Sequence, residues 1–306
     1  MLIRVLGGFL MALADSVPGV SGGTIAFLMG IYDEFINSLN NIVSKDKEKR
    51  KAAVFFLIKL GSGWIIGMAL ASIIINKIFE TYIYNISSLF IGFVLFAMPI
   101  IIMEEKECLK GKYYNVVFSV LGAALVALIA YFSASGIMGQ GADLSWGNFG
   151  FGMGIYLFVG AMCAISAMVL PGISGSTLLL VFGLYQAVMS AISGFLHLDF
   201  SYVPALFIFG FGMIAGVLTI VKVLRYGLVK KRSAMMYFIL GMMIGSLYAS
   251  VMGPASLKDN PQPPMTFETF NIWFFIIGGV VLFGLQFLKT MLDGKKADKE
   301  AVKEAK

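Results

Sequence analysis

Long stretches without a charged residue constrain the fold of this chain more than any other feature. Six such runs are 19 to 21 residues long: 114–132, 149–169, 177–196, 203–221, 234–252 and 270–288. Two more, 52–76 and 86–103, are interrupted only by Lys59 and by Pro99. A helix of about 20 apolar residues crosses the ~30 Å hydrocarbon core of a bilayer. The runs therefore predict transmembrane helices, whereas the apolar segments 5–14 and 24–32 are too short to span simply.

The composition agrees with burial in lipid. Hydrophobic residues make up 59% of the 306 residues and charged residues only 13%, too few to solvate a soluble protein of this size. The net charge of +6 does not indicate a nucleic-acid partner, because the basic residues lie in short loops between apolar runs. The two cysteines and the single histidine support neither a disulfide framework nor a metal site, and no cofactor is expected.

Lysine and arginine residues predict the orientation of the chain. They gather in four segments, 45–51, 106–112, 225–232 and the tail after residue 289, which we expect to be cytoplasmic. The other loops, 77–85, 133–148, 197–202 and 253–269, contain only Lys77 and Lys258 and should face outward. Both termini are then cytoplasmic. The N-terminal segment resembles a signal peptide, but part of it recurs later in the chain, so we expect no cleavage there.

The chain contains an internal repeat. Residues 14–32 align without gaps to residues 167–185, with eight identities in nineteen positions. The helix that follows repeats as well, since Gly63 and Gly67 correspond to Gly212 and Gly216. Their separation in the sequence is slightly shorter than that between residues 14–32 and 167–185. Glycines four residues apart are typical of close packing between membrane helices.

Combined with the charge pattern, the repeat predicts an all-α polytopic membrane protein with inverted topology. The first repeat is 1–148, the second is 149–290, and 291–306 form a charged cytoplasmic tail. Each half has a broken, re-entrant helical hairpin, through 5–40 or 149–196, followed by three transmembrane helices. Matching broken segments in inverted repeats indicate a binding site near the bilayer midplane. The alternative is an old duplication that is retained only for packing.

A Pro-Gly-x-Ser-Gly-x-Thr motif interrupts each hairpin. The breaks are at Pro18 and Gly19 and at Pro171 and Gly172, because proline lacks a backbone donor and glycine admits positive φ. Backbone amides freed in this way need partners, so such segments survive in a membrane only within protein or beside a polar cavity. Ser21 and Ser174 stand where the N-caps of the following helices are expected.

Two glycine-rich helix N-termini with hydroxyl groups are suited to binding an anion, most commonly phosphate. The predicted phosphate-binding residues are Ser21, Gly22, Gly23, Thr24, Ser174, Gly175, Ser176 and Thr177. The alternative is that each motif is only a tight hairpin tip.

Asp15 is the only acidic residue beside a break, and its counterpart in the repeat is Met168. A carboxylate at membrane depth is costly and usually functional, so we expect it to carry a proton or to pair with a cation. Lys59 is the candidate cation, although it could instead extend to the cytoplasmic edge of the membrane. Trp64 is interpreted as an interfacial anchor, and Asp33 with Glu34 as a solvated helix end.

The run from Ala14 to Thr24, the following Gly30-Ile31-Tyr32 and the second motif from Pro171 to Ser176 resemble the bacterial polyprenyl-phosphate transporter family of the PopT type, formerly a domain of unknown function. The resemblance covers essentially the whole chain. It implies a multi-pass protein of the bacterial cytoplasmic membrane that moves undecaprenyl phosphate, a carrier lipid of cell-wall synthesis, from the outer to the inner leaflet for reuse. Protons are the possible coupling ion.

Two other functions compete with this one. The same hairpins could carry a small soluble oxyanion. A phosphatase acting on undecaprenyl pyrophosphate would need a nucleophile or general base with an Arg/His cluster at one membrane face. No arginine lies in a predicted span and the only histidine, His197, is in a predicted outer loop, so no catalytic residue is proposed and an enzyme is not expected. The sequence does not predict the oligomeric state.

Overall fold

The computed structural model describes residues 2–15, 21–70, 76–135, 144, 150–256, 261–284 and 286–287, and these residues contain helices but no strand. The helices before residue 148 are α1 (Leu2–Asp15), α2 (Gly22–Leu28), α3 (Tyr32–Asn41), α4 (Lys47–Leu70), α5 (Asn76–Glu104), α6 (Lys106–Leu109) and α7 (Val116–Ser135). Those after it are α8 (Phe151–Val169), α9 (Gly175–Val181), α10 (Tyr185–Leu196), α11 (Val203–Lys230), α12 (Arg232–Met252) and a final helix, Ile272–Gly284.

Six helices in the described part of the chain are long and apolar enough to cross a membrane. These spans are Lys47–Leu70, Tyr82–Glu104, Tyr113–Phe132, Phe151–Val169, Phe200–Lys230 and Arg232–Ala255. The predicted all-helical membrane class is therefore confirmed. The predicted span at 270–288 corresponds to the final helix, whose described part is shorter.

The prediction of one continuous span over 177–196 is wrong. Gly183 has φ +65° and separates α9 from α10, and Gly30, with φ +66°, separates α2 from α3 at the matching position of the repeat. A left-handed glycine ends a helix, but glycine is also frequent inside membrane helices. An uncharged run of the right length therefore does not reveal this second break.

The basic segment 225–232 is also not the loop that its charges predicted. Arg225 and Lys230 belong to α11, and Lys231 alone separates that helix from α12. Helices of membrane proteins extend past the hydrocarbon, where long basic side chains reach water. The basic segment therefore lies mostly within helices, and the connection between α11 and α12 is a single residue.

The same glycine contacts recur in the two halves. A Cβ atom on Gly63 would lie 1.9 Å from the carbonyl oxygen of Val5 in α1, and one on Gly212 would lie 2.5 Å from that of Phe158 in α8. The next glycines of α4 and α11, four residues on, likewise touch the backbones of α1 and α8. The predicted small-residue packing faces are confirmed, since only glycine allows these backbones to approach so closely.

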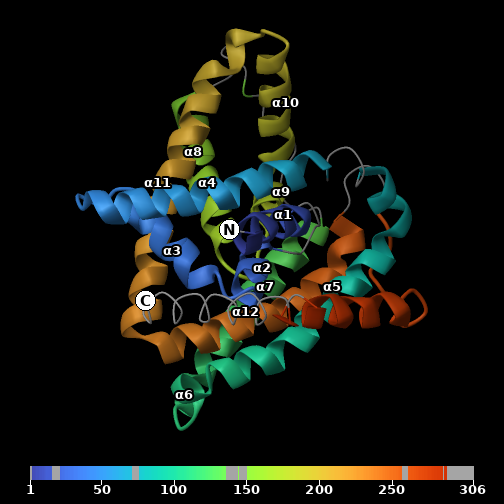
Figure 1. The fold of residues 1–306 in the computed structure, drawn as a ribbon. Helices are drawn as coiled ribbons and strands as arrows, with labels where there is room; N and C mark the ends of the chain where they lie inside the picture. Colours follow the sequence, from blue (N-terminus) through green and yellow to red (C-terminus); the bar gives the residue numbers. More distant parts are fainter. Residues whose placement is uncertain are drawn as a thin grey trace.

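The remaining long helices pair across the two halves. Gly92 of α5 packs against the backbone of Phe275 in the final helix, and Gly241 of α12 packs against that of Ser119 in α7. Each pair joins one helix from before residue 148 and one from after it. In Figure 1 these four helices gather on one side of the molecule, whereas α8, α10 and the first part of α11 extend together on the opposite side. The short helices α1 and α2 lie between the two groups.

Candidate functional site

The first break is stabilised by its own side chains. Ser21 is the N-cap of α2, and its Oγ accepts a hydrogen bond of 3.1 Å from the backbone amide of Gly23. The Oδ1 atom of Asp15, at the end of α1, accepts a bond of 2.7 Å from the amide of Gly22. Amides freed by the break thus have partners, as burial in a membrane requires. Pro18 and Gly19 lie outside the described residues.

The second break has the same position in the repeat but different bonds. Gly172 has φ +89°, in the left-handed region that glycine enters without strain. It follows Pro171, whose side chain is fully buried. Ser174 occupies the N-cap position of α9, but its Oγ lies 2.8 Å from the Oγ of Ser176 and makes no cap bond. The predicted capping is therefore confirmed in full only at Ser21.

The two breaks, far apart in sequence, contact each other. The hydroxyl of Ser21 donates to the carbonyl oxygen of Leu170 at 2.9 Å, and the amide of Gly172 donates to Oγ1 of Thr24 at 2.8 Å. Gly23 is equally close, because a Cβ atom on it would lie 2.9 Å from the oxygen of Leu170. We call these paired segments, residues 21–24 and 170–177, the hairpin tips.

The predicted site residues of both tips are largely removed from the surface. Ser21 is 0% exposed, Thr24 and Ser174 are each 3% exposed and Thr177 is 8% exposed. Gly22, Gly23 and Gly175 are buried, and Ser176 is intermediate. Several hydroxyls and amides from two distant segments therefore lie together in a buried region. In this arrangement Ser21 and Thr24 are bonded to the opposite tip, which makes the tips a closed contact.

Asp15 contacts a tryptophan and not the predicted lysine. Its Oδ2 accepts a bond of 3.1 Å from Nε1 of Trp64 in α4, and its other oxygen caps Gly22 as described. The Nζ atom of Lys59 lies 5.9 Å from the centre of the Phe55 ring. The structure thus does not bring Lys59 to Asp15. The indole N–H of the partly buried Trp64 thus has its hydrogen-bond acceptor in this carboxylate, a contact that its interpretation as an interfacial anchor does not include.

An ionic cluster joins segments from both halves at the start of α12. The guanidinium of Arg232 binds Glu105 through two nitrogens, at 2.9 and 2.5 Å, and Asp33 at 3.1 Å. These hydrogen bonds from Arg232 hold the pKa of Glu105 below its usual range. Asp33 and Glu34 are half-exposed, and Glu34 pairs with Arg4, so they are partnered as well as solvated.

A polar cavity of about 220 Å³ is lined both by this cluster and by residues from the stretch 27–32 of the first hairpin. Its lining includes Tyr32, whose hydroxyl donates to the carbonyl oxygen of Val169 just before the second tip. Sequence reasoning missed both Tyr32 and Arg232. A signal existed for the tyrosine, because Gly30-Ile31-Tyr32 recurs as Gly183-Leu184-Tyr185. None existed for the arginine, since its acidic partners are far away in sequence.

Candidate spanning helices with small-residue contacts and a buried polar contact between two helix breaks are typical of multi-pass membrane proteins of the transporter class. Comparison with known families gives the particular group. The model of the undecaprenyl phosphate translocase-like family matches residues 11–262, so the chain belongs to that family. It is a family of bacterial membrane transporters and not of enzymes.

Two relatives are similar over most of their length. The polyprenyl-phosphate transporter of Staphylococcus aureus is 36% identical over 249 residues, which cover 81% of this chain and 85% of the relative. The polyprenyl-phosphate transporter of Vibrio cholerae is 31% identical over 256 residues, 80% of this chain and 76% of the relative. No solved structure matches the chain significantly.

Proposed function

We propose that this protein carries undecaprenyl phosphate, or a closely similar polyprenyl phosphate, from the outer to the inner leaflet of the bacterial cytoplasmic membrane. The lipid would then be available again for cell-envelope synthesis. Membership in the undecaprenyl phosphate translocase-like family supports this function. The structural observation that supports it is the buried contact between the two hairpin tips. A charged phosphate needs such a group of donors to leave water, whereas its isoprenoid tail can stay in lipid.

The phosphate would be held between the tips. The donors are the hydroxyls of Ser21, Thr24, Ser174, Ser176 and Thr177 together with backbone amides, including those of Gly22, Gly23 and Gly175. In the closed contact some of these groups bond to the opposite tip, as Ser21 does to Leu170. When the tips separate, the same groups are left unpaired in a membrane, which is costly unless an anion satisfies them. Substrate binding and separation of the tips are therefore coupled.

Inverted repeats explain how the phosphate site would open to the outer and to the inner leaflet. The matching contacts of Gly63 and Gly212 support a duplication, and the distribution of basic residues favours opposite orientations of the two copies. Two oppositely oriented hairpins meeting at one site would allow it to open to either leaflet in turn. Residues 1–148 and 149–290 are the proposed repeats, with the basic tail 291–306 and both termini in the cytoplasm.

Labelling with a membrane-impermeant thiol reagent tests this topology. In a variant without Cys108 and Cys163, Glu48→Cys should react only from the cytoplasm, and Asp143→Cys only from outside. Glu48 lies in the basic segment 45–51, in the first turn of α4, and Asp143 belongs to the segment 133–148, which has no basic residue. The positive-inside rule assigns the two segments to opposite faces. Reaction of Glu48→Cys from outside, or of Asp143→Cys from the cytoplasm, would contradict the proposed orientation.

Removing the tip hydroxyls tests the proposed phosphate site. A hydrogen bond to a charged group contributes about 1.5–3 kcal/mol, so Ser21→Ala and Ser174→Ala should each slow exchange of undecaprenyl phosphate by roughly 10- to 100-fold. Exchange would be measured in proteoliposomes that contain equal amounts of folded protein. Ser119→Ala is a matched control, because its hydroxyl bonds to the carbonyl oxygen of Tyr237 in α12 and not to a residue of either tip. Wild-type exchange in both single variants and in the double variant would refute the site.

A further inference from the structure

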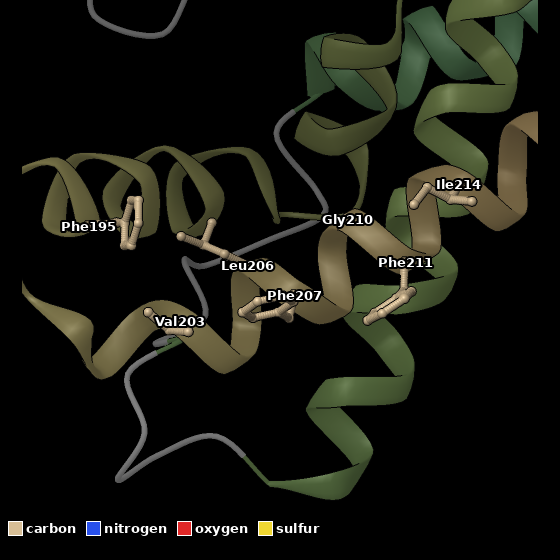
Figure 2. Close-up of a pocket in the computed structure, with 7 residues that line it drawn as sticks. All are labelled: Phe195, Val203, Leu206, Phe207, Gly210, Phe211 and Ile214. Carbon is tan, nitrogen blue, oxygen red and sulfur yellow. The ribbon is translucent and has the colours of Figure 1, made fainter.

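The polar cavity beside the ionic cluster is lined by charged side chains. They belong to Asp33, Glu104, Glu105 and Arg232, around a volume of about 220 Å³. Figure 2 shows the contrast with a groove between α10 and α11, whose labelled side chains contain carbon alone. We propose that Arg232 binds the phosphate of the transported lipid in this polar cavity, as a second phosphate site besides the hairpin tips. The inference rests on the proposed function.

Two lining residues connect the cavity to the hairpin tips. The hydroxyl of Tyr32 donates to the carbonyl oxygen of Val169 at 3.2 Å. The next residue is Leu170, whose own carbonyl oxygen accepts a bond that joins the two tips. Phe27 lies three residues after Thr24 in α2, and residues three apart share one face of a helix. The cavity therefore begins about one helical turn from the first tip.

The other end of the cavity lies near the surface. Tyr32 is 1% exposed, whereas the side chains of Asp33 and Arg232 are 46% and 39% exposed. Lys230 and Lys231 directly precede Arg232, in a basic segment that the positive-inside rule assigns to the cytoplasm. In the proposed orientation, the cavity thus lies between the buried tips and the cytoplasmic surface, where the phosphate has to leave.

The guanidinium of Arg232 has one fixed partner and one that can be replaced. Glu105 binds Nε and Nη2 together, which orients the planar group. Asp33 binds Nη1 alone, at 3.1 Å, and belongs to α3 of the first hairpin. When the tips separate, a shift of that hairpin withdraws Asp33, and the phosphate takes its place, because a guanidinium binds both kinds of oxyanion. The remaining carboxylates repel an anion, which keeps this site weak and favours release.

Protection of arginine from chemical modification tests the site directly. Phenylglyoxal modifies exposed guanidinium groups, and mass spectrometry would follow each arginine of the full-length protein in nanodiscs. Farnesyl phosphate, a short polyprenyl phosphate, at about ten times its dissociation constant should slow modification of Arg232 about tenfold, because the free site falls by that factor. Farnesol should give no protection, and inorganic phosphate at the same concentration much less. Arg50, exposed near the start of α4, is the internal control.

Matched variants separate a phosphate site from a purely structural ion pair. Asp33→Asn removes the carboxylate that competes for Nη1, so farnesyl phosphate should protect Arg232 at concentrations about two- to fivefold lower. Glu34→Gln removes the same charge from the same turn of α3, but Glu34 pairs with Arg4, so protection should stay as in the wild type. Arg232→Gln should slow exchange of undecaprenyl phosphate about tenfold or more.

The outcomes separate failure of this inference from failure of the proposed function. If wild-type protein does not exchange undecaprenyl phosphate in proteoliposomes, the proposed function is wrong. If it does, and farnesyl phosphate leaves the modification of Arg232 unchanged, Arg232 is not a phosphate site. The same conclusion follows if Asp33→Asn is protected no better than the wild type, or if Glu34→Gln gains as much. Equal protection by inorganic phosphate would assign the site to a free anion and overturn the assignment to the lipid.

Discussion

Replacing Gly172 by alanine should lower both the stability of the protein and its rate of transport. The residue has φ +89°, and a Cβ atom on it would lie 2.7 Å from the carbonyl oxygen of Met242 and 3.0 Å from its carbonyl carbon. The left-handed conformation alone costs a non-glycine residue about 1–2 kcal/mol. Because the close atoms belong to backbone, they cannot rotate away. The second tip must shift, which weakens the bond from Gly172 to Thr24.

We expect a loss of roughly 2–4 kcal/mol in stability and more than about tenfold in transport. The stability would be measured by thermal unfolding in nanodiscs, and transport by leaflet exchange at matched amounts of folded protein. Gly152→Ala in α8 is a suitable control, because a Cβ atom there meets nothing within 4 Å. If the two variants were indistinguishable, the conformation of the second tip would not be important for transport.

Replacing Asp15 by asparagine should abolish the response of transport to a proton gradient. Moving an anionic phosphate inward opposes an inside-negative potential by about 2.3 kcal/mol per charge per 100 mV. A proton carried with the lipid would neutralise one charge, and a difference of two pH units would supply about 2.7 kcal/mol, or about 100-fold in the accumulation ratio. Asp15 lies beside the first tip, bonded to Gly22 and Trp64, and is the carboxylate best placed to carry that proton.

The same contacts support a purely structural alternative, in which Asp15 only caps the break. Asparagine has one acceptor oxygen where the carboxylate offers two, so its cap would be weaker in either case. The gradient response distinguishes the roles. Trp64→Phe is the matched control, because it removes one partner of Asp15 and keeps the carboxylate. Proton carriage predicts that Trp64→Phe still responds to the gradient and Asp15→Asn does not; a normal response in Asp15→Asn would assign Asp15 to capping alone.

Features encoded within a few residues were predictable from the sequence. The uncharged runs predicted a membrane protein, and the Pro-Gly motifs predicted helix breaks near Asp15 and Pro171. Both predictions succeed because hydropathy and backbone preference depend only on residues that are close in the sequence. The break at Gly183 was missed, since a single glycine within an apolar run does not distinguish a turn from a packing position. Its counterpart at Gly30 provides a signal only once the structure shows that both residues have positive φ.

Features that depend on distant partners could not be derived in this way. The hydrogen bond from Trp64 to Asp15 joins residues 49 positions apart, so the sequence around either residue does not reveal it. Arg232 looks like one of several loop cations, although it binds Glu105 and Asp33 from the other half of the chain. The pairing of α5 with the final helix and of α12 with α7 likewise depends on backbone contacts that leave no pattern beyond scattered glycines.

The proposed function is tested most directly by leaflet exchange of purified protein in liposomes that carry undecaprenyl phosphate in the outer leaflet only. Accessible lipid, released phosphate and uptake of inorganic phosphate would be followed together, against protein-free liposomes. We predict a protein-dependent loss of accessible undecaprenyl phosphate, with no phosphate released and no uptake of inorganic phosphate. Exchange no faster than in protein-free liposomes, or uptake of inorganic phosphate in its place, would contradict translocation of a polyprenyl phosphate.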